Sequence, residues 1–332
     1  MIRLLLLPAC LLLACVQLSC TRLDPVISET LRLRHQGADM PIWVRGNFES
    51  RKLLLFLHGG PGECSICLRE YFAGIEAEMA VAYWDQRISG SASGTAGPET
   101  IRYTQYAEDL ELVIRLLQRQ YPGVQIYLFG HSFGVELAWQ FLTTGQQQDL
   151  VRGAILLNGT YATYDWLKAV EAWMLREADR QGDTEALNYV RSHPVRRETM
   201  RQTDWGAWYS RMFRLGANPV WPTDDPGFRF RRWFRSPGSP TSQWANTSRY
   251  DRYYAEEIFT FDRSEQLGQI RIPIGLFWGL RDGIMPAALA QETLRRLPGP
   301  VDYVEFPDSW HSAFHTETEA FTRAVLAFAE RY

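Results

Sequence analysis

The chain has 332 residues, 46% of them hydrophobic and 13% aromatic, so it can bury the core of one large or two modest domains and is not a disordered chain. Its formal net charge is −3, and no run of Lys and Arg resembles a nucleic-acid-binding arm. We therefore expect no nucleic-acid partner.

Residues 1–20 have the composition of a signal peptide, because a positive charge at Arg3 is followed by the apolar stretch 4–13. This stretch is too short for a transmembrane helix, which needs about 20 apolar residues. Small residues precede Cys15 and Cys20, as in the lipobox of bacterial lipoproteins, where the cysteine becomes the lipidated N-terminus. Cys15 has the more typical leucine before it and Cys20 the more usual leader length, so both stay open. We expect an exported protein, anchored to a membrane by that lipid. The alternatives are a periplasmic or secreted protein without lipid, and a leader that stays uncleaved.

Seven short apolar segments, rich in residues suited to buried parallel strands, follow the leader. They are residues 41–45, 53–57, 80–84, 125–129, 154–157, 274–278 and 301–306. Helical patterns separate many of them, and the clearest one is expected to begin with Thr104 as its N-cap and to stop at Pro122-Gly123. This alternation predicts an α/β fold, in which a mostly parallel central sheet carries helices on both faces.

The glycine-rich sequence His58-Gly-Gly-Pro-Gly62 follows the strand 53–57 directly, and Cys64 and Cys67 come soon after it. These are the two cysteines outside the leader, and their spacing permits a local disulfide in an oxidising compartment or two buried thiols. A thioredoxin-type redox pair is a weaker alternative, and a structural zinc site would need about four ligands. We expect no metal and no other cofactor.

The strand 80–84 is followed by Asp85-Gln86-Arg87. An acid and an arginine in this position commonly hold together the loop beneath a site by paired hydrogen bonds. We therefore predict a structural role for these residues rather than a catalytic one.

The motif Gly130-His-Ser-Phe-Gly134 lies directly between the strand 125–129 and a helical segment, 135–142. A G-x-S-x-G sequence in that context forms a sharp turn that exposes its serine at the carboxyl edge of the sheet. Ser132 is therefore the predicted nucleophile, and the N-terminus of the following helix favours the negative charge that develops there.

The segment from about Tyr161 to Glu265 contains no convincing buried strand. Seven of the twelve tryptophans fall in it, namely Trp166, Trp173, Trp205, Trp208, Trp221, Trp233 and Trp244. We predict that residues 161–265 form a helical lid inserted into a catalytic core made of residues 24–160 and 266–332. The tryptophans alternatively form only the insertion's own small core.

A serine nucleophile needs a histidine base and an orienting carboxylate, which follow the serine in the order Asp, His for this kind of turn. His311 lies just past the last predicted strand and is the expected base. His315 is the second candidate for the base, and His193 falls in the insertion. Asp282 follows the strand 274–278 directly and is the expected carboxylate. Asp308 is interpreted as a loop or capping residue that could offer a second acid.

The glycine-rich sequence is predicted to form part of an oxyanion hole, because a serine hydrolase needs two backbone N–H groups that stabilise the oxyanion. One donor belongs to the residue after the nucleophile, Phe133, and the other to the loop after an earlier strand. Gly60 is the predicted second donor, with Gly59 next. A plain glycine turn without a catalytic role is the alternative.

In order and in motif, the chain resembles the α/β-hydrolases of the proline iminopeptidase type over about residues 40–160 and 265–332. The resemblance is carried by His58-Gly-Gly-Pro-Gly62, Tyr83-Trp-Asp-Gln-Arg87, Gly130-His-Ser-Phe-Gly134, Gly279-Leu-Arg-Asp282 and His311-Ser-Ala. The chain differs from that family at the turn around the predicted nucleophile, where the family usually has glycine and tryptophan in place of His131 and Phe133. The resemblance implies a serine peptidase that removes an N-terminal residue, often proline, from short peptides without a cofactor.

The segment Arg249-Tyr-Asp251-Arg-Tyr-Tyr254 loosely resembles the part of such enzymes that binds the substrate amine. Asp251, Glu256 and Glu257 are therefore the candidate substrate-binding residues, and a solvated helix surface is their alternative interpretation. Two other functions stay open. One is a carboxylesterase or lipase acting on small esters or lactones with the same triad, and the other is a non-catalytic binding protein on a hydrolase scaffold.

Overall fold

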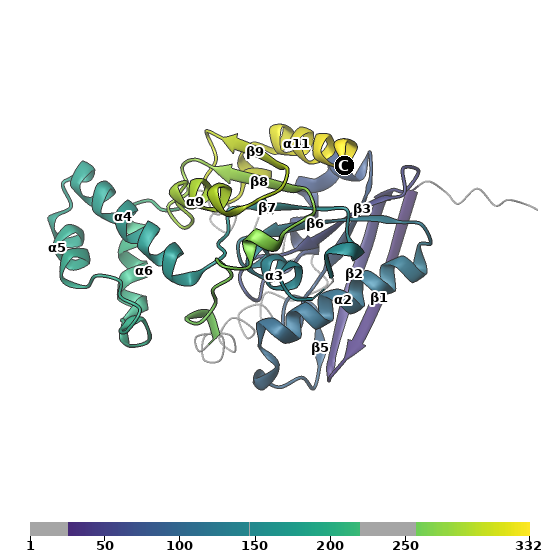
Figure 1. Cartoon of the computed structure of the whole chain (residues 1–332), viewed down its shortest axis with the longest axis horizontal. Coiled ribbons are helices and arrows are strands. Elements are labelled where there is room, and N and C mark those ends of the chain that lie inside the picture. Colours follow the sequence, from purple (N-terminus) through teal and green to yellow (C-terminus); the bar gives the residue numbers. More distant parts are fainter. Residues whose placement is uncertain (1–25, 146, 220–256) are drawn as a thin grey trace, which may run out of the picture.

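The computed structural model describes residues 26–145, 147–219 and 257–332. Their strands form a nine-stranded sheet in the order β1-β2-β4-β3-β6-β7-β8-β9, with the short β5 paired to β2 (Figure 1). The strands are β1 (Val26–His35), β2 (Ala38–Asn47), β3 (Lys52–Leu57), β4 (Ala80–Trp84), β5 (Ser93–Gly94), β6 (Gln125–His131), β7 (Gly153–Leu157), β8 (Ile274–Gly279) and β9 (Val301–Phe306). From β4 through β9 along this order, neighbouring strands run parallel.

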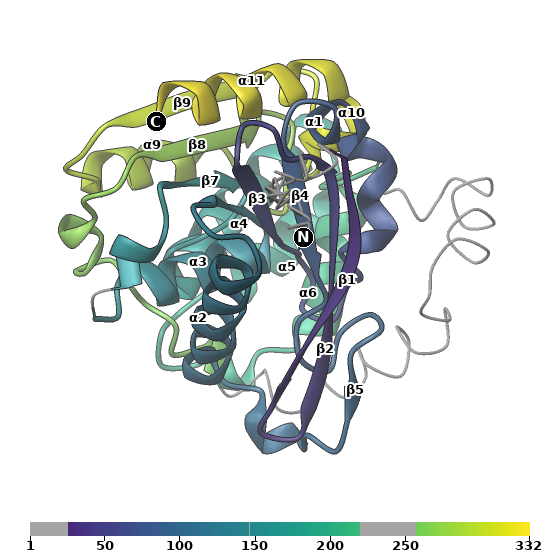
Figure 2. The same ribbon diagram turned by 90° about the vertical axis from the view of Figure 1, so that its right-hand side faces the viewer.

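Helices cover both faces of the sheet. The α-helices are α1 (Ala73–Glu76), α2 (Tyr103–Gln120), α3 (Phe133–Leu142), α4 (Thr163–Gln181), α5 (Thr184–Ser192), α6 (Trp205–Arg214), α9 (Ala288–Arg296), α10 (Ala313–Thr316) and α11 (Thr318–Arg331). Short 3₁₀ helices are η1 (Ile66–Phe72), η2 (Pro98–Thr100), η3 (Gln147–Leu150), η4 (Met200–Gln202) and η6 (Leu267–Gln269). Helices α2 and α3 lie on one face, and α1, α10 and α11 on the other (Figure 2). Within the described residues, no helix is both long enough and apolar enough to cross a membrane.

The two faces of the sheet carry separate apolar cores, as alternation along β3 shows. Leu53, Leu55 and Leu57 belong to the core beneath α2 and α3. Leu54 and Phe56 point the other way, into the core beneath α1 and α11. Successive side chains of a strand point to opposite faces, so a strand buried on both sides is an uninterrupted apolar run. The predicted α/β fold with a mostly parallel sheet is confirmed.

All seven predicted strands are present, but the first prediction needs a correction. The segment 41–45 does not run parallel to its neighbours, because it is part of the longer β2, which pairs antiparallel with both β1 and β4. Sequence analysis missed two strands, β1 and β5. The edge strand β1 is mostly exposed and shows only a weak apolar alternation, and β5 has only two residues, both exposed. Gln36 and Gly37, both with positive φ, form the tight turn that joins β1 to β2.

The predicted N-cap Thr104 is also wrong. Helix α2 begins one residue earlier, at Tyr103, and the residue before it, Arg102, makes no capping hydrogen bond with its side chain. Instead, the carboxylate of Glu257 accepts a hydrogen bond of 2.6 Å from the backbone N–H of Tyr103. A carboxylate distant in sequence thus satisfies one of the free N–H groups at the start of the helix, and the local pattern could not indicate it.

Helices α4, α5 and α6 lie together at the end of the molecule away from β1 and β2 (Figure 1). They belong to the segment between β7 and β8, whose two ends meet at an isolated antiparallel bridge between Ala162 and Asp262. Thr163 N–H donates to the Phe261 carbonyl at 3.0 Å, and Arg263 N–H donates to the Tyr161 carbonyl at 2.8 Å. The chain therefore leaves the sheet and returns to it at the same place, beside the boundaries predicted for the lid.

Candidate active site

Ser132 occupies a strained turn between β6 and α3. Its φ of 54° and ψ of −121° lie outside the regions that non-glycine residues normally adopt. Its N–H donates to the Leu157 carbonyl at 3.1 Å, and its own carbonyl accepts from Val135 N–H at 2.8 Å. The side chain is half-buried, and the residue lines a cavity. The turn thus presents the hydroxyl at the carboxyl edge of the sheet, where sequence analysis placed the nucleophile.

His311 and Asp282 meet through a short hydrogen bond. The Nδ1 atom of His311 lies 2.7 Å from Oδ2 of Asp282, and both side chains are almost fully buried. Because the carboxylate accepts this bond, Nδ1 carries the proton, and the Nε2 of a neutral imidazole is left as the basic nitrogen. Asp282 Oδ1 in turn accepts from Ile284 N–H at 2.7 Å, which fixes the plane of the carboxylate.

Asn158 is a part of this arrangement that sequence analysis missed. Its side-chain amide donates to Asp282 Oδ2 at 2.5 Å, and its side-chain oxygen accepts from Gly279 N–H at 2.9 Å. Asn158 has a φ of 46°, which asparagine tolerates better than most residues. It therefore joins the ends of β7 and β8 and holds the carboxylate. A polar residue directly after the buried strand β7 was the signal that could have revealed it.

We expect Asn158→Ala to lower kcat about tenfold and to destabilise the fold by about 1–3 kcal/mol. The buried Gly279 N–H would lose its acceptor, and Asp282 one of its donors. Steady-state kinetics and thermal unfolding measure the two effects. Asn47→Ala is a matched control, because the hydrogen bonds of that side chain, to the Ala77 carbonyl and from Glu49 N–H, are exposed. An unchanged kcat in Asn158→Ala would show that Asp282 is oriented without Asn158.

The residues ranked second for base and acid lie elsewhere. His315 is in α10, and its ring packs 4.9 Å from that of Tyr71. His193 is exposed and stacks on Tyr189. Asp308 forms an exposed ion pair with Arg281. The structure thus unites His311 with Asp282 and places these three at other positions.

The loop His58–Gly62 packs directly against the turn at Ser132. A Cβ atom added at Gly59 would lie 3.1 Å from both His131 Nδ1 and Ser132 Cβ, and 3.2 Å from a carboxylate oxygen of Glu63. The predicted oxyanion donors Gly60 and Phe133 line the same cavity as Ser132. Both therefore lie beside the predicted nucleophile, although they are far apart in sequence.

Two buried histidines support this loop and His311, the predicted base. His58 Nδ1–H donates to the Gly59 carbonyl at 2.8 Å, while its Nε2 accepts from Gln86 N–H at 3.3 Å. His131 Nε2–H donates to the backbone carbonyl of His311 at 2.9 Å. Burial, and secondly the neighbouring His311, hold the pKa of His131 well below its usual value. Both rings are therefore neutral structural groups, and the residue next to Ser132 positions the backbone of His311.

Burial lowers the pKa of His58 to about 4, and this predicts acid sensitivity. The unfolded chain binds a proton at this residue below about pH 6.5, whereas the folded protein does so only near pH 4. The free energy of unfolding is therefore not reduced by this residue above pH 6.5. It falls as the pH drops towards 4, and His58 accounts for roughly 3 kcal/mol of the loss. Urea unfolding at pH 7, 6, 5 and 4 measures the slope. His58→Asn should reduce the slope and leave the part that comes from His131, whose pKa is also lowered; an unchanged slope would assign the acid sensitivity to other groups.

The residues after β4 play a structural role, but with different partners from those expected. Arg87 pairs with Asp109 of α2 through two hydrogen bonds of 2.5 and 2.7 Å in a fully buried ion pair. Asp85 accepts hydrogen bonds from the N–H and hydroxyl groups of Ser65, each at 2.8 Å. The acid therefore holds the loop after the glycine-rich sequence, and the arginine holds α2.

Cys64 and Cys67 form a disulfide, with Sγ atoms 2.14 Å apart. The bond closes the loop between the glycine-rich sequence and η1. Of the options that the spacing left open, the structure contains the local disulfide.

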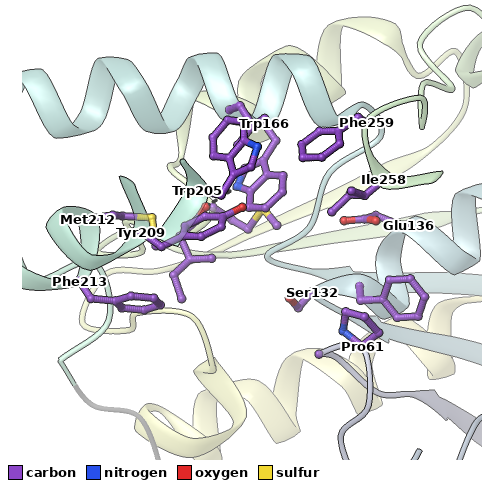
Figure 3. A pocket seen from close by; sticks show the side chains of 15 residues that line it. Pro61, Ser132, Glu136, Trp166, Trp205, Tyr209, Met212, Phe213, Ile258 and Phe259 are labelled. Carbon is purple, nitrogen blue, oxygen red and sulfur yellow. Dashed lines mark hydrogen bonds between the residues drawn. The ribbon is translucent and has the colours of Figure 1, made fainter. Parts of the chain in front are cut away.

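A cavity of about 400 Å³ opens above Ser132 (Figure 3). Residues of the core form its floor, and residues of α4, α6 and the segment before β8 form its walls. Its lining consists of Gly60, Pro61, Ser132, Phe133, Glu136, Trp166, Leu167, Trp205, Tyr209, Met212, Phe213, Ile258, Phe259, Ile284 and Met285. A mostly apolar pocket with a few polar groups is typical of a small-molecule site.

Of the candidate substrate-binding residues, Glu257 is the one that lies in the described part of the chain. Asp251 and Glu256 lie outside the described residues. Glu257 caps α2 through Tyr103 N–H and is not part of the cavity wall, so its predicted contact with substrate is replaced by a structural one. Among the described residues that line the cavity, the acidic one is Glu136, which sequence analysis missed. Its position one helical turn after Ser132 was the available signal.

Comparisons with known proteins agree with this architecture. A family described as alpha/beta hydrolase fold matches residues 52–318. The probable aminopeptidase YbaC of Bacillus subtilis (strain 168) is 23% identical over 308 residues, which are 88% of this chain and 93% of that protein. A proline iminopeptidase-related protein from Thermus thermophilus superposes with a TM-score of 0.59 at 24% identity, covering 91% of this chain and 98% of the other. An esterase from Exiguobacterium antarcticum reaches the same TM-score at 16% identity, covering 92% of this chain and 100% of the other. Peptidase-like and esterase-like proteins are therefore both similar to this chain.

Proposed function

The chain belongs to the alpha/beta hydrolase fold family, and from this premise we propose that it is a serine hydrolase that acts through an acyl-enzyme on Ser132. The observation that carries the proposal is the buried hydrogen bond of 2.7 Å between His311 and Asp282, beside a serine held in a strained turn. Ser132 lines a cavity and its neighbour His131 contacts His311, so a nucleophile, a base and an orienting carboxylate follow one another as a catalytic serine requires.

In the proposed reaction, the Ser132 hydroxyl oxygen attacks a carbonyl carbon while His311 Nε2 takes its proton. Asp282 stabilises the imidazolium that forms, and the N–H groups of Gly60 and Phe133 stabilise the oxyanion. The tetrahedral intermediate then expels the leaving group, which takes the proton from His311. Water attacks the acyl-enzyme by the same route, giving the carboxylic acid and the free serine.

Among substrates, we favour small peptides with a free N-terminus, so that the enzyme is an aminopeptidase of the proline iminopeptidase type. The support is the shared set of motifs, the likeness to an aminopeptidase over most of both chains, and a carboxylate in the cavity. A carboxylesterase for small esters or lactones is the second candidate. The aromatic and apolar walls of the cavity favour it, since they suit an uncharged acyl group.

We further propose that residues 161–265 act as a lid and that the protein is exported. The aromatic wall that α4 and α6 place over Ser132 supports the lid. The disulfide between Cys64 and Cys67 supports export, because such bonds persist in oxidising compartments. Lipidation at Cys15 or Cys20 rests on the sequence alone, and these residues lie outside the described part of the chain. Mass spectrometry of the mature N-terminus from the native host would distinguish the two cysteines.

The proposed function is tested by paired kinetics on the full chain. Proline and alanine arylamides with a free amine are compared with their N-acetylated forms and with a short-chain aryl ester, and Ser132→Ala is the inactive reference. Turnover of the free-amine substrates that acetylation abolishes supports the aminopeptidase. Turnover of the ester alone supports the esterase. Failure of a fluorophosphonate to label Ser132 in the folded protein would contradict both and favour a non-catalytic binding protein.

A further inference from the structure

The glycine-rich loop is held at both of its ends by two neighbouring residues that follow β4. Before the loop, the His58 carbonyl accepts from the Gln86 side chain at 3.2 Å, and the His58 ring accepts from Gln86 N–H at 3.3 Å. After the loop, the N–H and the hydroxyl of Ser65 both donate to Asp85 Oδ1 at 2.8 Å. All four residues are fully buried. The residues between His58 and Ser65 therefore span two fixed points on one segment of the chain.

Asp85 is itself fixed by the backbone around it. Its second carboxylate oxygen, Oδ2, accepts from Ser91 N–H at 2.7 Å, and its own N–H donates to the Pro41 carbonyl of β2 at 3.2 Å. A Cβ atom added at Gly90 would clash with the same carboxylate, so the turn after β4 packs closely around it. A buried carboxylate with several hydrogen-bond donors is a rigid partner. Through Asp85, Ser65 is therefore attached to the sheet.

The disulfide encloses Ser65. It joins Cys64 to Cys67, whose Cα atoms are 5.4 Å apart. Leu68 N–H donates to the Ser65 carbonyl at 3.1 Å, and Leu68 and Phe72 of η1 are buried in the core beneath α1 and α11. The bond thus connects the end of the loop to a helix that packs on the core. Opening it gives the backbone around Ser65 more conformations, and so lowers the population in which Ser65 keeps its hydrogen bonds.

The position of this loop matters for the proposed oxyanion hole. Gly60, the predicted donor, lies between the two fixed ends and has a φ of 108°. The loop touches the nucleophile, since a Cβ atom added at Gly59 would lie 3.1 Å from Ser132 Cβ, and Figure 3 shows Pro61 beside Ser132. A donor stabilises the oxyanion when it stands about 2.7–3.1 Å from it, so a displacement of about 1 Å lowers turnover far more than it lowers substrate binding.

We propose that Ser65, fixed by the disulfide between Cys64 and Cys67, positions Gly60 as an oxyanion donor, so that turnover is fast only while this disulfide is formed. Ser65 and the disulfide act through the loop and are positioning groups. The inference rests on the proposed serine hydrolase function and adds to it a control by the redox state of the surroundings. The protein is folded but slow in a reducing compartment, and oxidation makes it fully active.

A dithiol such as dithiothreitol opens the bond in two exchange steps. Its thiolate attacks Sγ of Cys67, the more exposed of the two cysteines, and Cys64 leaves as a thiolate that takes up a proton. The second thiolate of the reagent then attacks its own sulfur in the mixed disulfide and releases Cys67 as a thiol. The protein gains two electrons and two protons, and the reagent becomes a cyclic disulfide. Oxidised glutathione reverses the change.

The test compares the oxidised and reduced full chain at a temperature well below unfolding. The measured quantities are kcat, KM and the rate at which a fluorophosphonate labels Ser132. We expect dithiothreitol to lower kcat and the labelling rate about 10- to 100-fold while KM changes by less than about threefold, and oxidised glutathione to restore both rates. The double variant Cys64→Ser with Cys67→Ser is the matched control, because it keeps the three leader cysteines. It should be slow and insensitive to dithiothreitol.

A second variant separates the hydrogen bonds of Ser65 from the covalent bond. Ser65→Ala keeps the disulfide but removes the hydroxyl that donates to Asp85, and we expect kcat to fall about tenfold with KM unchanged. Ser50→Ala is its control and should keep the parent kcat, because Ser50 lies in an exposed turn, where its hydroxyl accepts from Lys52 N–H at 3.4 Å. Circular dichroism and thermal unfolding verify the fold of each variant and of the reduced protein.

The outcomes distinguish this inference from the proposed function. An unchanged kcat in the reduced, folded protein would overturn the inference, and so would a loss of kcat that accompanies unfolding, because the disulfide would then be a general stabilising bond. An unchanged kcat in Ser65→Ala would contradict the role of Ser65. If the oxidised parent turns over no substrate and is not labelled at Ser132, the proposed serine hydrolase function itself fails.

Discussion

Replacing Asp282 with asparagine is expected to lower kcat about 10⁴-fold while the protein stays folded. Asp282 Oδ2 accepts hydrogen bonds from both His311 Nδ1–H and the side-chain amide of Asn158. An asparagine that offers its oxygen there can still accept these bonds but carries no charge to stabilise the imidazolium. An asparagine that offers its NH₂ group forces the proton of His311 onto Nε2, which then cannot act as the base.

The measurement is kcat and kcat/KM on the best substrate, together with the rate at which a fluorophosphonate labels Ser132. Asp308→Asn is the matched control, since this residue, the second candidate acid, lies in an exposed ion pair with Arg281. Its turnover should stay within about twofold of the parent. A loss of less than tenfold in Asp282→Asn would contradict the assignment of this aspartate as the partner of the base.

Gly134→Ala is expected to destabilise the fold by about 3 kcal/mol or more and to remove activity with it. An added Cβ would stand 2.0 Å from the Leu57 carbonyl oxygen and 2.7 Å from its carbon, and both belong to the backbone of β3. That strand is paired on both sides and leads into the loop at His58, so it has little room to move. The effect opposes helix propensity, which alone would make alanine the better residue in α3 by up to about 1 kcal/mol.

Urea unfolding followed by circular dichroism measures the loss. Gly268→Ala is the matched control, because nothing lies within 4 Å of its added Cβ. We expect that variant to differ from the parent by no more than about 0.5 kcal/mol. A stable, active Gly134→Ala protein would mean that helix α3 can move away from β3, and that the tight turn at Ser132 does not depend on the absence of this side chain.

The elements that sequence analysis predicted correctly are those with a strong local signal. Strands buried on both faces, such as β3 and β6, consist mostly of apolar residues over six or seven positions, and this length favours a strand over a helix. The elbow around Ser132 lies between such a strand and an apolar helix, so its context identified it. Pairing of His311 with Asp282 followed from chain order, because each comes just after a strand of one parallel sheet.

The predictions that failed depended on contacts between distant parts of the chain. The cap of α2 comes from Glu257, 154 residues away from Tyr103, so the local choice of Thr104 was wrong. Similarly, Asn158 reaches Asp282 across 124 residues of sequence. No spacing rule links such pairs, because the folding of the sheet brings them together.

By itself, the sequence determined the α/β architecture, the buried parallel strands and the place of the sharp turn at Ser132, because periodicity and turn chemistry are local properties. Only the tertiary structure decided which carboxylate faces the cavity. In the sequence, Glu136 is an ordinary acidic residue in the first turn of a helix, whereas Glu257 follows a segment that resembles a substrate-binding one. Tyr103, at the start of α2, contacts both acids, since its hydroxyl donates to Glu136 and its N–H donates to Glu257. Glu136 is thereby buried in the cavity wall and Glu257 becomes a helix cap, because a buried carboxylate needs hydrogen-bond donors.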